Sequence, residues 1–165
     1  MRSHQFTIGR TFGVALDDGE DFFEALNGFC RSTGVRQGYL PMFLAGFREA
    51  EIVGTCEKLA DPKAPVWSSV HLENVEALGC GTIAYDEEGD RTLPHVHTTL
   101  GRKAQSAAGL TSHLLSAEVQ FLVEMVVVEV TFPRMRRLPN PDLYNVPLLT
   151  FEAPGRPSSR PEGEG

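Results

Sequence analysis

Residues 118–130, EVQFLVEMVVVEV, decide the fold of this 165-residue chain more than any other stretch. Strand side chains alternate between two faces, so odd-numbered residues from Val119 to Val127 share one face and even-numbered residues from Leu122 to Val130 the other. A strand that is apolar on both faces is buried on both, which predicts a central place in its sheet or contact with another subunit. The exception is Glu124, which stands among apolar neighbours and, if buried, needs a partner.

Upstream of this strand, one helix and several further strands are predicted. Apolar residues recur at helical spacing between Phe22 and Cys30, which predicts a helix near residues 19–33, with Asp18 as N-cap and Gly34 at its end. The pattern is therefore one helix followed by a β-rich chain, which predicts a fold with both α and β elements. Strands are expected at 6–16, 39–46, 47–56, 67–72, 75–85, 92–100 and 119–132.

The length and composition indicate one domain followed by an extension. A chain of 165 residues is long enough to bury a single core. From Leu138 onward proline dominates, so residues 1–137 are expected to form the domain and residues 138–165 a proline-rich C-terminal extension. The last dozen residues, 154–165, lack the apolar content to fold and are expected to be disordered.

Charge and cysteine content narrow the function classes. The formal net charge is −7 and the pI about 5.2, which argues against a surface built to wrap nucleic-acid phosphates. Cys30, Cys56 and Cys80 form no CxxC pair and are expected to be reduced thiols of an intracellular protein. We find neither a signal region nor an apolar stretch near the roughly 18 residues of a membrane span, so a cytoplasmic protein is expected.

The chemistry-bearing motif is His95-Val96-His97 with a third histidine at His113. Two histidines one residue apart on a strand point to the same side, and His113 on a neighbouring strand completes a three-imidazole face. Zn²⁺ bound by three imidazoles keeps a fourth position for water, whose pKa falls to about 7. In the alternative interpretation, the histidines face solvent or donate to backbone carbonyls.

Other candidate residues have two interpretations each. Glu124 could orient a ligand imidazole from the second shell or accept a proton from bound water, or it could form a buried ion pair. Cys80 could be a soft ligand, although the glycines on both sides of it fit tight strand packing better. Arg102 and Lys103 could attract an anion, or they could lie in a solvated turn. The remaining histidines, His4 and His71, lack ligand spacing and are expected to be surface or structural residues.

Three segments give the chain a resemblance to a known family: Pro94–Gly101, Ser112–Leu115 and Val119–Glu124. Together they resemble the plants-and-prokaryotes-conserved domain (PPC or PCC), found beside AT-hooks in plant nuclear proteins and alone in bacteria and archaea. The resemblance implies an α+β fold, a compact α/β-type domain whose largely antiparallel mixed sheet of about six to seven strands is flanked by helices. It also implies assembly as a homotrimer and zinc held by the three histidines. The chain departs from the family pattern before His113, where Thr111-Ser112 replaces two glycines.

The resemblance implies a regulatory or DNA-associated module that serves as an oligomerisation and partner platform. AT-hooks read narrow A·T minor grooves through an Arg-Gly-Arg-Pro core. Here Gly155-Arg156-Pro157 follows Pro154 instead of an arginine, and Glu162 and Glu164 come next, so direct duplex binding by this chain alone is not predicted.

The competing class is a zinc-dependent enzyme. A three-histidine site with an open position could activate water in a hydrolase or lyase that acts on a small anionic or carbonyl substrate. The chain has no nucleophile elbow, phosphate loop or dinucleotide fingerprint, so the sequence names no substrate or other small-molecule ligand. Imidazole sites also accept Ni, Co, Cu or Fe, so the identity of the metal stays open.

Overall fold

Seven strands and one α-helix make up the computed structural model, which describes residues 3–55, 61, 63, 65–105 and 108–152. In chain order the elements are β1 (Thr7–Asp17), α1 (Phe22–Thr33), β2 (Gly38–Val53), β3 (Ser69–Asp86), β4 (Arg91–Arg102), β5 (Gly109–Phe132), β6 (Arg134–Asn140) and β7 (Val146–Glu152). Short 3₁₀ turns occupy Lys103–Gln105 and Pro141–Leu143.

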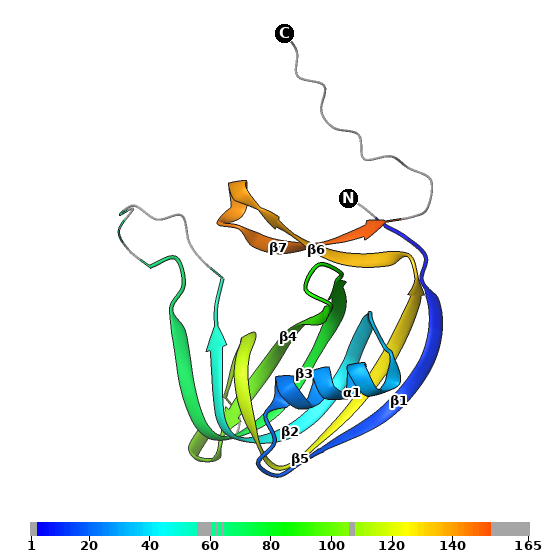
Figure 1. Cartoon of the computed structure of the whole chain (residues 1–165). Helices are drawn as coiled ribbons and strands as arrows, with labels where there is room; N and C mark the ends of the chain where they lie inside the picture. Colours follow the sequence, from blue (N-terminus) through cyan, green and yellow to red (C-terminus); the bar gives the residue numbers. More distant parts are fainter. Residues whose placement is uncertain (1–2, 56–60, 62, 64, 106–107, 153–165) are drawn as a thin grey trace.

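The first five strands close into an antiparallel barrel. Their order is β1-β5-β2-β3-β4, and β4 pairs again with the start of β5, so the sheet has no open edge between these two strands (Figure 1). The expected α+β fold with flanking helices is wrong, because 68% of the described residues lie in strands and only 13% in helical turns. A closed barrel buries its inner face against itself and needs no layer of helices to cover it.

The strand β5 has an interior position in the sheet, as its two apolar faces predict. It pairs with β2 along most of its length, with β4 at its start and with β1 at its end. Val119, Val123 and Val127 point inward and are fully buried. Glu124 points outward between Ala15 and Leu44 and is exposed, so its expected burial is wrong. The strand alternation puts Glu124 out of phase with the core residues on either side of it.

The predicted helix is confirmed, with a different N-cap. Asp21 Oδ1 accepts a hydrogen bond from the Glu24 amide at 2.8 Å, and Gly34 ends the helix at φ 73°. Asp18, the expected cap, instead accepts a hydrogen bond from the Phe121 amide. The helix has one apolar face, as an amphipathic stripe predicts. Its buried residues are Phe22, Leu26 and Cys30.

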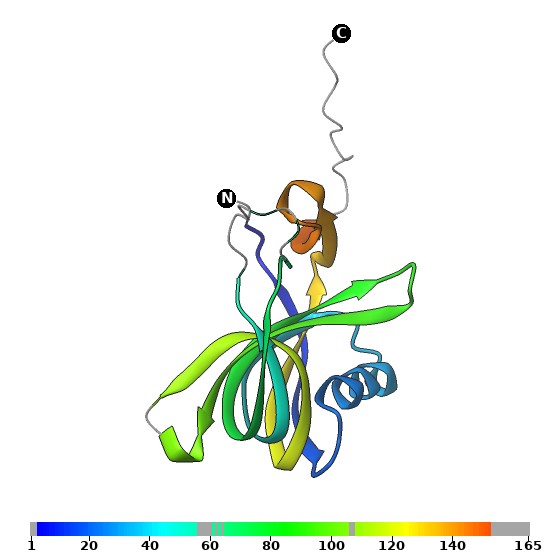
Figure 2. The ribbon, with the colours of Figure 1, turned by 90° about the vertical axis from the view of Figure 1, so that its left-hand side faces the viewer.

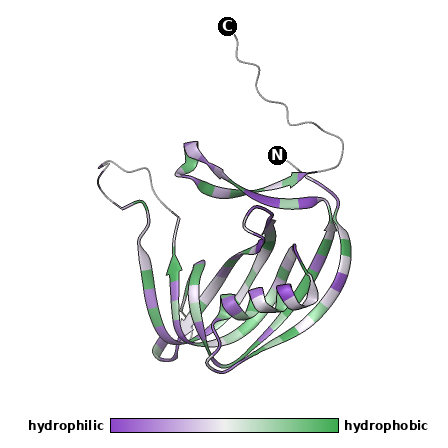
Figure 3. Ribbon diagram, viewed as in Figure 1, coloured by the Kyte–Doolittle hydropathy of each residue, from purple (hydrophilic) through white to green (hydrophobic). Residues whose placement is uncertain are grey.

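The helix α1 packs across the side of the barrel between β1 and β4 (Figure 2). Phe29 meets Phe12 of β1 edge-on, with ring centroids 5.2 Å apart. Asn27 and Thr92 of β4 are joined by a side-chain hydrogen bond. Apolar and polar residues alternate along much of the barrel strands, which gives the barrel an apolar interior shared with α1 (Figure 3).

The hairpin of β6 and β7 lies across one end of the barrel (Figure 1). Met135 of β6 is fully buried in a second apolar cluster with Ala84 and Val130. The part expected to be an extension, from residue 138, therefore contributes ordered structure as far as Glu152. The last dozen residues lie outside the described part of the chain. No helix in the described residues is long and apolar enough to cross a membrane.

Candidate metal centre

The alternation of β4 places two histidines on the outer face of the barrel. Val96, Thr98 and Leu100 point inward and are buried. His95 and His97 occupy the opposite face, as their spacing predicts.

The third histidine is brought to this face by the first part of β5. His113 is the direct cross-strand partner of His97 in the β4–β5 ladder. The residues just before it are anchored through their side chains: Ser112 Oγ donates to the Val53 carbonyl, and Thr111 Oγ1 lies 2.7 Å from Thr99 Oγ1. Thr111 and Ser112, which replace two glycines of the family pattern, therefore hydrogen-bond the start of β5 to β4 and β2.

The three imidazoles converge closely enough to share one cation. Each offers a nitrogen, and these three atoms lie within 4.8 Å of one another. Ring centroids are 5.0 Å apart for His95 and His97, 4.7 Å for His95 and His113, and 5.5 Å for His97 and His113. Within the described residues, this is the one such group of potential ligands.

Burial favours the unprotonated form of two of the three histidines, His95 and His113. It lowers the pKa of His95 to about 4, with further contributions from Arg137, His113 and His97. Burial also lowers the pKa of His113, and the charges of His97 and Arg137 act in the same direction. At neutral pH both imidazoles therefore carry free lone pairs, the form in which histidine binds metals.

The polar atoms of the cluster fit a metal better than a set of structural hydrogen bonds. Within the described chain, none of the three imidazoles hydrogen-bonds to a backbone carbonyl or to any other group. Nδ1 of His113 is buried without a partner, which is costly unless a ligand satisfies it. His97 is exposed, so solvent reaches the cluster from that side. Three imidazoles with one accessible side match the donor set of an open Zn²⁺ site.

Arg137 of β6 is a neighbour of the cluster that the sequence did not reveal. Its Nη2 donates to Thr82 Oγ1 at 2.5 Å, and Thr82 is the direct cross-strand partner of His95. The residue lies outside the histidine motifs, in a hairpin whose return across the barrel no local pattern predicts. The one feature of the sequence that could have drawn attention to it is the pair of adjacent arginines, Arg136 and Arg137.

Glu124 pairs with strands that carry none of the three histidines, whereas Cys80 pairs directly with one of them. Glu124 has neighbours on β1 and β2, whereas the histidines lie on β4 and the start of β5. Among described residues it makes no hydrogen bond or ion pair. Cys80 is the cross-strand partner of His97 and is exposed, but its sulfur is not part of the ligand group.

The other candidates are surface residues in the structure. Arg102 ends β4 and Lys103 begins a 3₁₀ turn, and both are exposed. His71 is exposed, with its Nε2 3.9 Å from Glu73 Oε1. The ring of His4 stacks at a tilt on Phe151, 5.6 Å between centroids.

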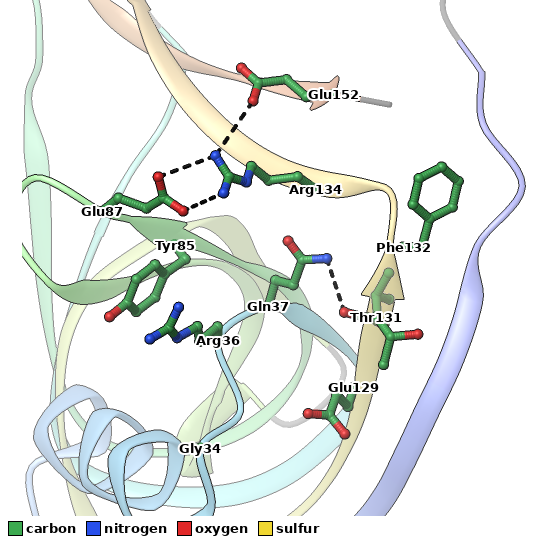
Figure 4. A pocket seen from close by; sticks show the side chains of 11 residues that line it. Gly34, Arg36, Gln37, Tyr85, Glu87, Glu129, Thr131, Phe132, Arg134 and Glu152 are labelled. Carbon is green, nitrogen blue, oxygen red and sulfur yellow. Dashed lines mark hydrogen bonds and ion pairs between the residues drawn. The ribbon is translucent and has the colours of Figure 1, made fainter. Parts of the chain in front are cut away.

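One cavity of the described structure lies away from the histidines. It has a volume of 630 Å³ and lies under the β6–β7 hairpin, where Tyr85, Glu87 and Arg134 line it (Figure 4). Its charged groups are mostly engaged with one another, since Arg134 pairs with Glu87 and Glu152. The titratable groups suited to bind a metal are therefore on the barrel surface and not in this cavity.

Comparisons with known proteins agree with this fold. The family model of the Plants and Prokaryotes Conserved (PCC) domain matches residues 3–131. A metal-containing protein from Archaeoglobus fulgidus is similar in structure, with a TM-score of 0.74, 21% identity and coverage of 91% of this chain and 99% of that chain. A plant- and prokaryote-conserved (PPC) protein from Pyrococcus horikoshii is also similar, with a TM-score of 0.74, 20% identity and coverage of 94% of this chain and 100% of that chain. A provisionally named DNA-binding protein from Bacteroides thetaiotaomicron has a TM-score of 0.67 and 23% identity, and the match covers 90% of this chain and 98% of that chain. No curated protein matches the chain.

Proposed function

Because the chain belongs to the PCC domain family, we propose that it is a metal-binding, homotrimeric module of regulatory or DNA-associated type. His95, His97 and His113 hold the metal in this proposal. The observation that carries it is the convergence of three imidazole nitrogens within 4.8 Å from two neighbouring strands.

Zinc is the first candidate for the ion. Zn²⁺ accepts three imidazoles and keeps a fourth, exchangeable position, which the exposed side of His97 makes reachable. The similar protein from Archaeoglobus fulgidus is metal-containing by name, which supports a metal here without naming it. Ni²⁺, Co²⁺ and Cu²⁺ suit the same donor set, so the metal has to be measured.

Metal analysis of protein purified without a histidine tag tests this proposal. We expect one transition metal per chain by mass spectrometry, and its loss in His97→Ala. Because His97 is exposed, this substitution should leave the fold intact. His71→Ala, also an exposed histidine, is the matched control and should keep the metal. A wild-type chain that neither carries a metal nor takes up added Zn²⁺ would remove the proposed centre.

The homotrimer is proposed from the family and from an exposed apolar surface. Leu44, Leu78, Phe121 and Leu122 lie on the outside of β2, β3 and β5, and we call them the outer apolar face. Phe121 is 74% exposed and has a φ of 71°, in the left-handed region that a bulky side chain rarely adopts. Holding a phenyl ring in solvent with a strained backbone is unfavourable unless a partner covers it, and further copies of this chain are the proposed partner.

The DNA-associated role is proposed as one exerted through the assembly or its partners. The net charge of −7 works against direct contact with phosphates. We therefore expect the isolated chain not to bind an A·T-rich duplex at about 50 mM salt, where electrostatic binding is strong. Binding by fluorescence anisotropy that weakens steeply with added salt would instead make the chain itself a DNA-binding protein. The free thiols of Cys30 and Cys80 fit the cytoplasm, which is the proposed compartment.

The alternative is a zinc-dependent hydrolase or lyase, and the open side of the metal site beside Arg137 favours it. A panel of ester, phosphoester, lactone and 2-keto acid substrates, tested before and after chelation, distinguishes this enzyme from a binding module. Turnover that chelator abolishes and Zn²⁺ restores would establish the enzyme. The second-shell or base role of Glu124 stays a prediction, and Glu124→Gln in an active protein tests it by the pH profile of turnover.

A further inference from the structure

The arginines of β6 differ in what neutralises them. Arg134 pairs with Glu87 and Glu152, and Arg136 pairs with Glu152 at 3.2 Å. Arg137 faces the barrel instead, and no carboxylate among the described residues lies within ion-pair distance of it. A half-buried guanidinium without a counter-ion is costly, so its retention calls for an anionic partner from outside the chain.

Within the part of the chain that the structure describes, the guanidinium of Arg137 is held by neutral oxygens only. Nη2 donates to Thr82 Oγ1, and Nη1 donates to the Pro147 carbonyl of β7 at 3.3 Å. Nε is buried and has no acceptor. Of its five N–H groups, these contacts use two, so the head group is fixed in place with donors to spare.

This guanidinium lies at the rim of the histidine cluster. Thr82 and His95 are direct cross-strand partners, and such pairs share one face of the sheet with Cβ atoms about 5 Å apart. The hydrogen bond to Thr82 therefore brings the head group of Arg137 beside the His95 ring. The neighbourhood holds the imidazoles of the cluster and the positively charged guanidinium, and a bound divalent metal would add two more positive charges.

We propose that Arg137 and the open metal position together form a subsite for a small carboxylate ligand. With a metal held by the three imidazoles, one carboxylate oxygen would complete the coordination of the metal and the other would accept hydrogen bonds from the guanidinium. Arginine is suited to this role because its planar fork matches a carboxylate in shape and charge. The inference rests on the proposed metal centre and gives the chemical class of its ligand.

Acetate binding to the Co²⁺-loaded protein tests the subsite. The visible absorption of Co²⁺ changes when its coordination changes, so it reports acetate without any need for turnover. In Arg137→Gln we expect the same Co²⁺ content and acetate binding about tenfold to hundredfold weaker, the range of a lost charge-assisted hydrogen bond. Arg136→Gln is the matched control, since Arg136 is paired with Glu152, and should bind acetate as the wild type does. Neutral acetamide should bind weakly to all three.

Each outcome bears on the proposal. Since no described carboxylate pairs with Arg137, removing its charge leaves no buried partner unpaired, and Arg137→Met should also fold. This variant replaces Arg137→Gln if Arg137→Gln fails to fold by circular dichroism. Equal acetate affinity in the wild type and the folded variant overturns the subsite and leaves the metal centre standing. Acetamide binding as tight as acetate overturns it as well. A wild type that takes up no Co²⁺ overturns the metal centre and the subsite together.

Discussion

A single strand, β4, presents chemistry on one side and core on the other. Behind it, Gly79 of β3 leaves room for the ring of Phe43 of β2 and for the close approach of the β4 backbone. A Cβ at Gly79 would lie 2.3 Å from Cζ of Phe43 and 2.6 Å from the His97 carbonyl oxygen. Gly81 likewise leaves room for Val96, so the glycines around Cys80 serve tight packing, as expected from the sequence. The histidines are thus positioned by the packing behind them.

The thiol of Cys30 gives a test of the core at the residue scale. Burial against the barrel raises the pKa of this thiol to about 11 from an ordinary value of 9.0. Between these values the unfolded chain loses the proton and the folded chain keeps it, so stability present below pH 9 is lost as the pH rises. We expect the free energy of unfolding to fall by about 1.4 kcal/mol per pH unit from pH 9 to 11.

Cys30→Ala isolates this contribution from other groups that titrate in the same range. The substitution shortens a buried side chain and costs stability at every pH, but it removes the thiol titration. Urea unfolding at several pH values should therefore give a shallower decline for the variant. Parallel curves for the two proteins would mean that Cys30 is not buried as the structure has it.

At this scale the sequence predicts residues whose position follows from a local period. His95 and His97 share a face because the strand period is two, and Gly34 ends the helix because only a left-handed residue fits there. Asp18 and Asp21 are equally good caps by type, and only the path of the chain decides between them. Arg137 depends on a hairpin crossing over β3, which is a tertiary contact without a local signature.

At the scale of elements, the metal would fasten the seam that closes the barrel. The pairing of β4 with β5 runs only from His97–His113 to Gly101–Gly109, and the proposed ligands come from both of these strands. At free Zn²⁺ 100-fold above its dissociation constant, binding should stabilise the protein by about 2.7 kcal/mol. Differential scanning fluorimetry with Zn²⁺ and with chelator measures this change.

Hydrogen exchange locates the effect. After chelation, amides of β4 and the start of β5 should exchange faster, while the β1–β5 ladder around Val123 should be unchanged. Protection lost evenly over the whole barrel would argue that the metal acts on global stability alone.

The hairpin that carries Arg137 is joined to the barrel through Gln37. Its Nε2 donates to the carbonyls of Val130 and Pro133, and its Oε1 accepts from the Met135 amide at 2.7 Å. Gln37→Ala leaves these half-buried groups without partners, so we expect a loss of about 1–3 kcal/mol in unfolding free energy. Faster hydrogen exchange in residues 134–152 should accompany it. Gln105→Ala, at an exposed 3₁₀ turn, should change neither quantity.

The barrel strands and the helix were predictable in outline, but β6 and β7 were not predicted, and neither was the joining of the barrel strands. Residues 39–46 and 47–56 look like separate strands because polar and small residues interrupt the apolar pattern. The structure has one strand, β2, bent at register shifts near Leu40–Phe43 and Phe47–Glu49. Such shifts curve a strand without ending it, which lets five strands close into a barrel. Barrel closure depends on that curvature, and no local pattern in residues 39–56 encodes it.

For the whole molecule, the outer apolar face sets the expected assembly. Leu44 and Leu78 are cross-strand partners on the barrel surface, 45% and 56% exposed. A cavity of 270 Å³ lies beside Phe121 and Leu122 on the same side. A stable interface removes about 800 Å² from each partner, and four exposed apolar side chains, one of them a projecting aromatic ring, supply part of that area.

Light scattering of the purified chain at micromolar concentration tests the assembly. We expect three times the 18.1 kDa of the chain for the wild type. Phe121→Glu should give the monomer, because a carboxylate cannot be desolvated at the centre of an apolar contact. Its circular dichroism should be unchanged, since the ring makes little contact within its own chain. Leu143→Glu, at an exposed position on the β6–β7 hairpin, should keep the trimer. A wild type that scatters as a monomer contradicts the assembly, and Phe121 would then need another partner to cover it.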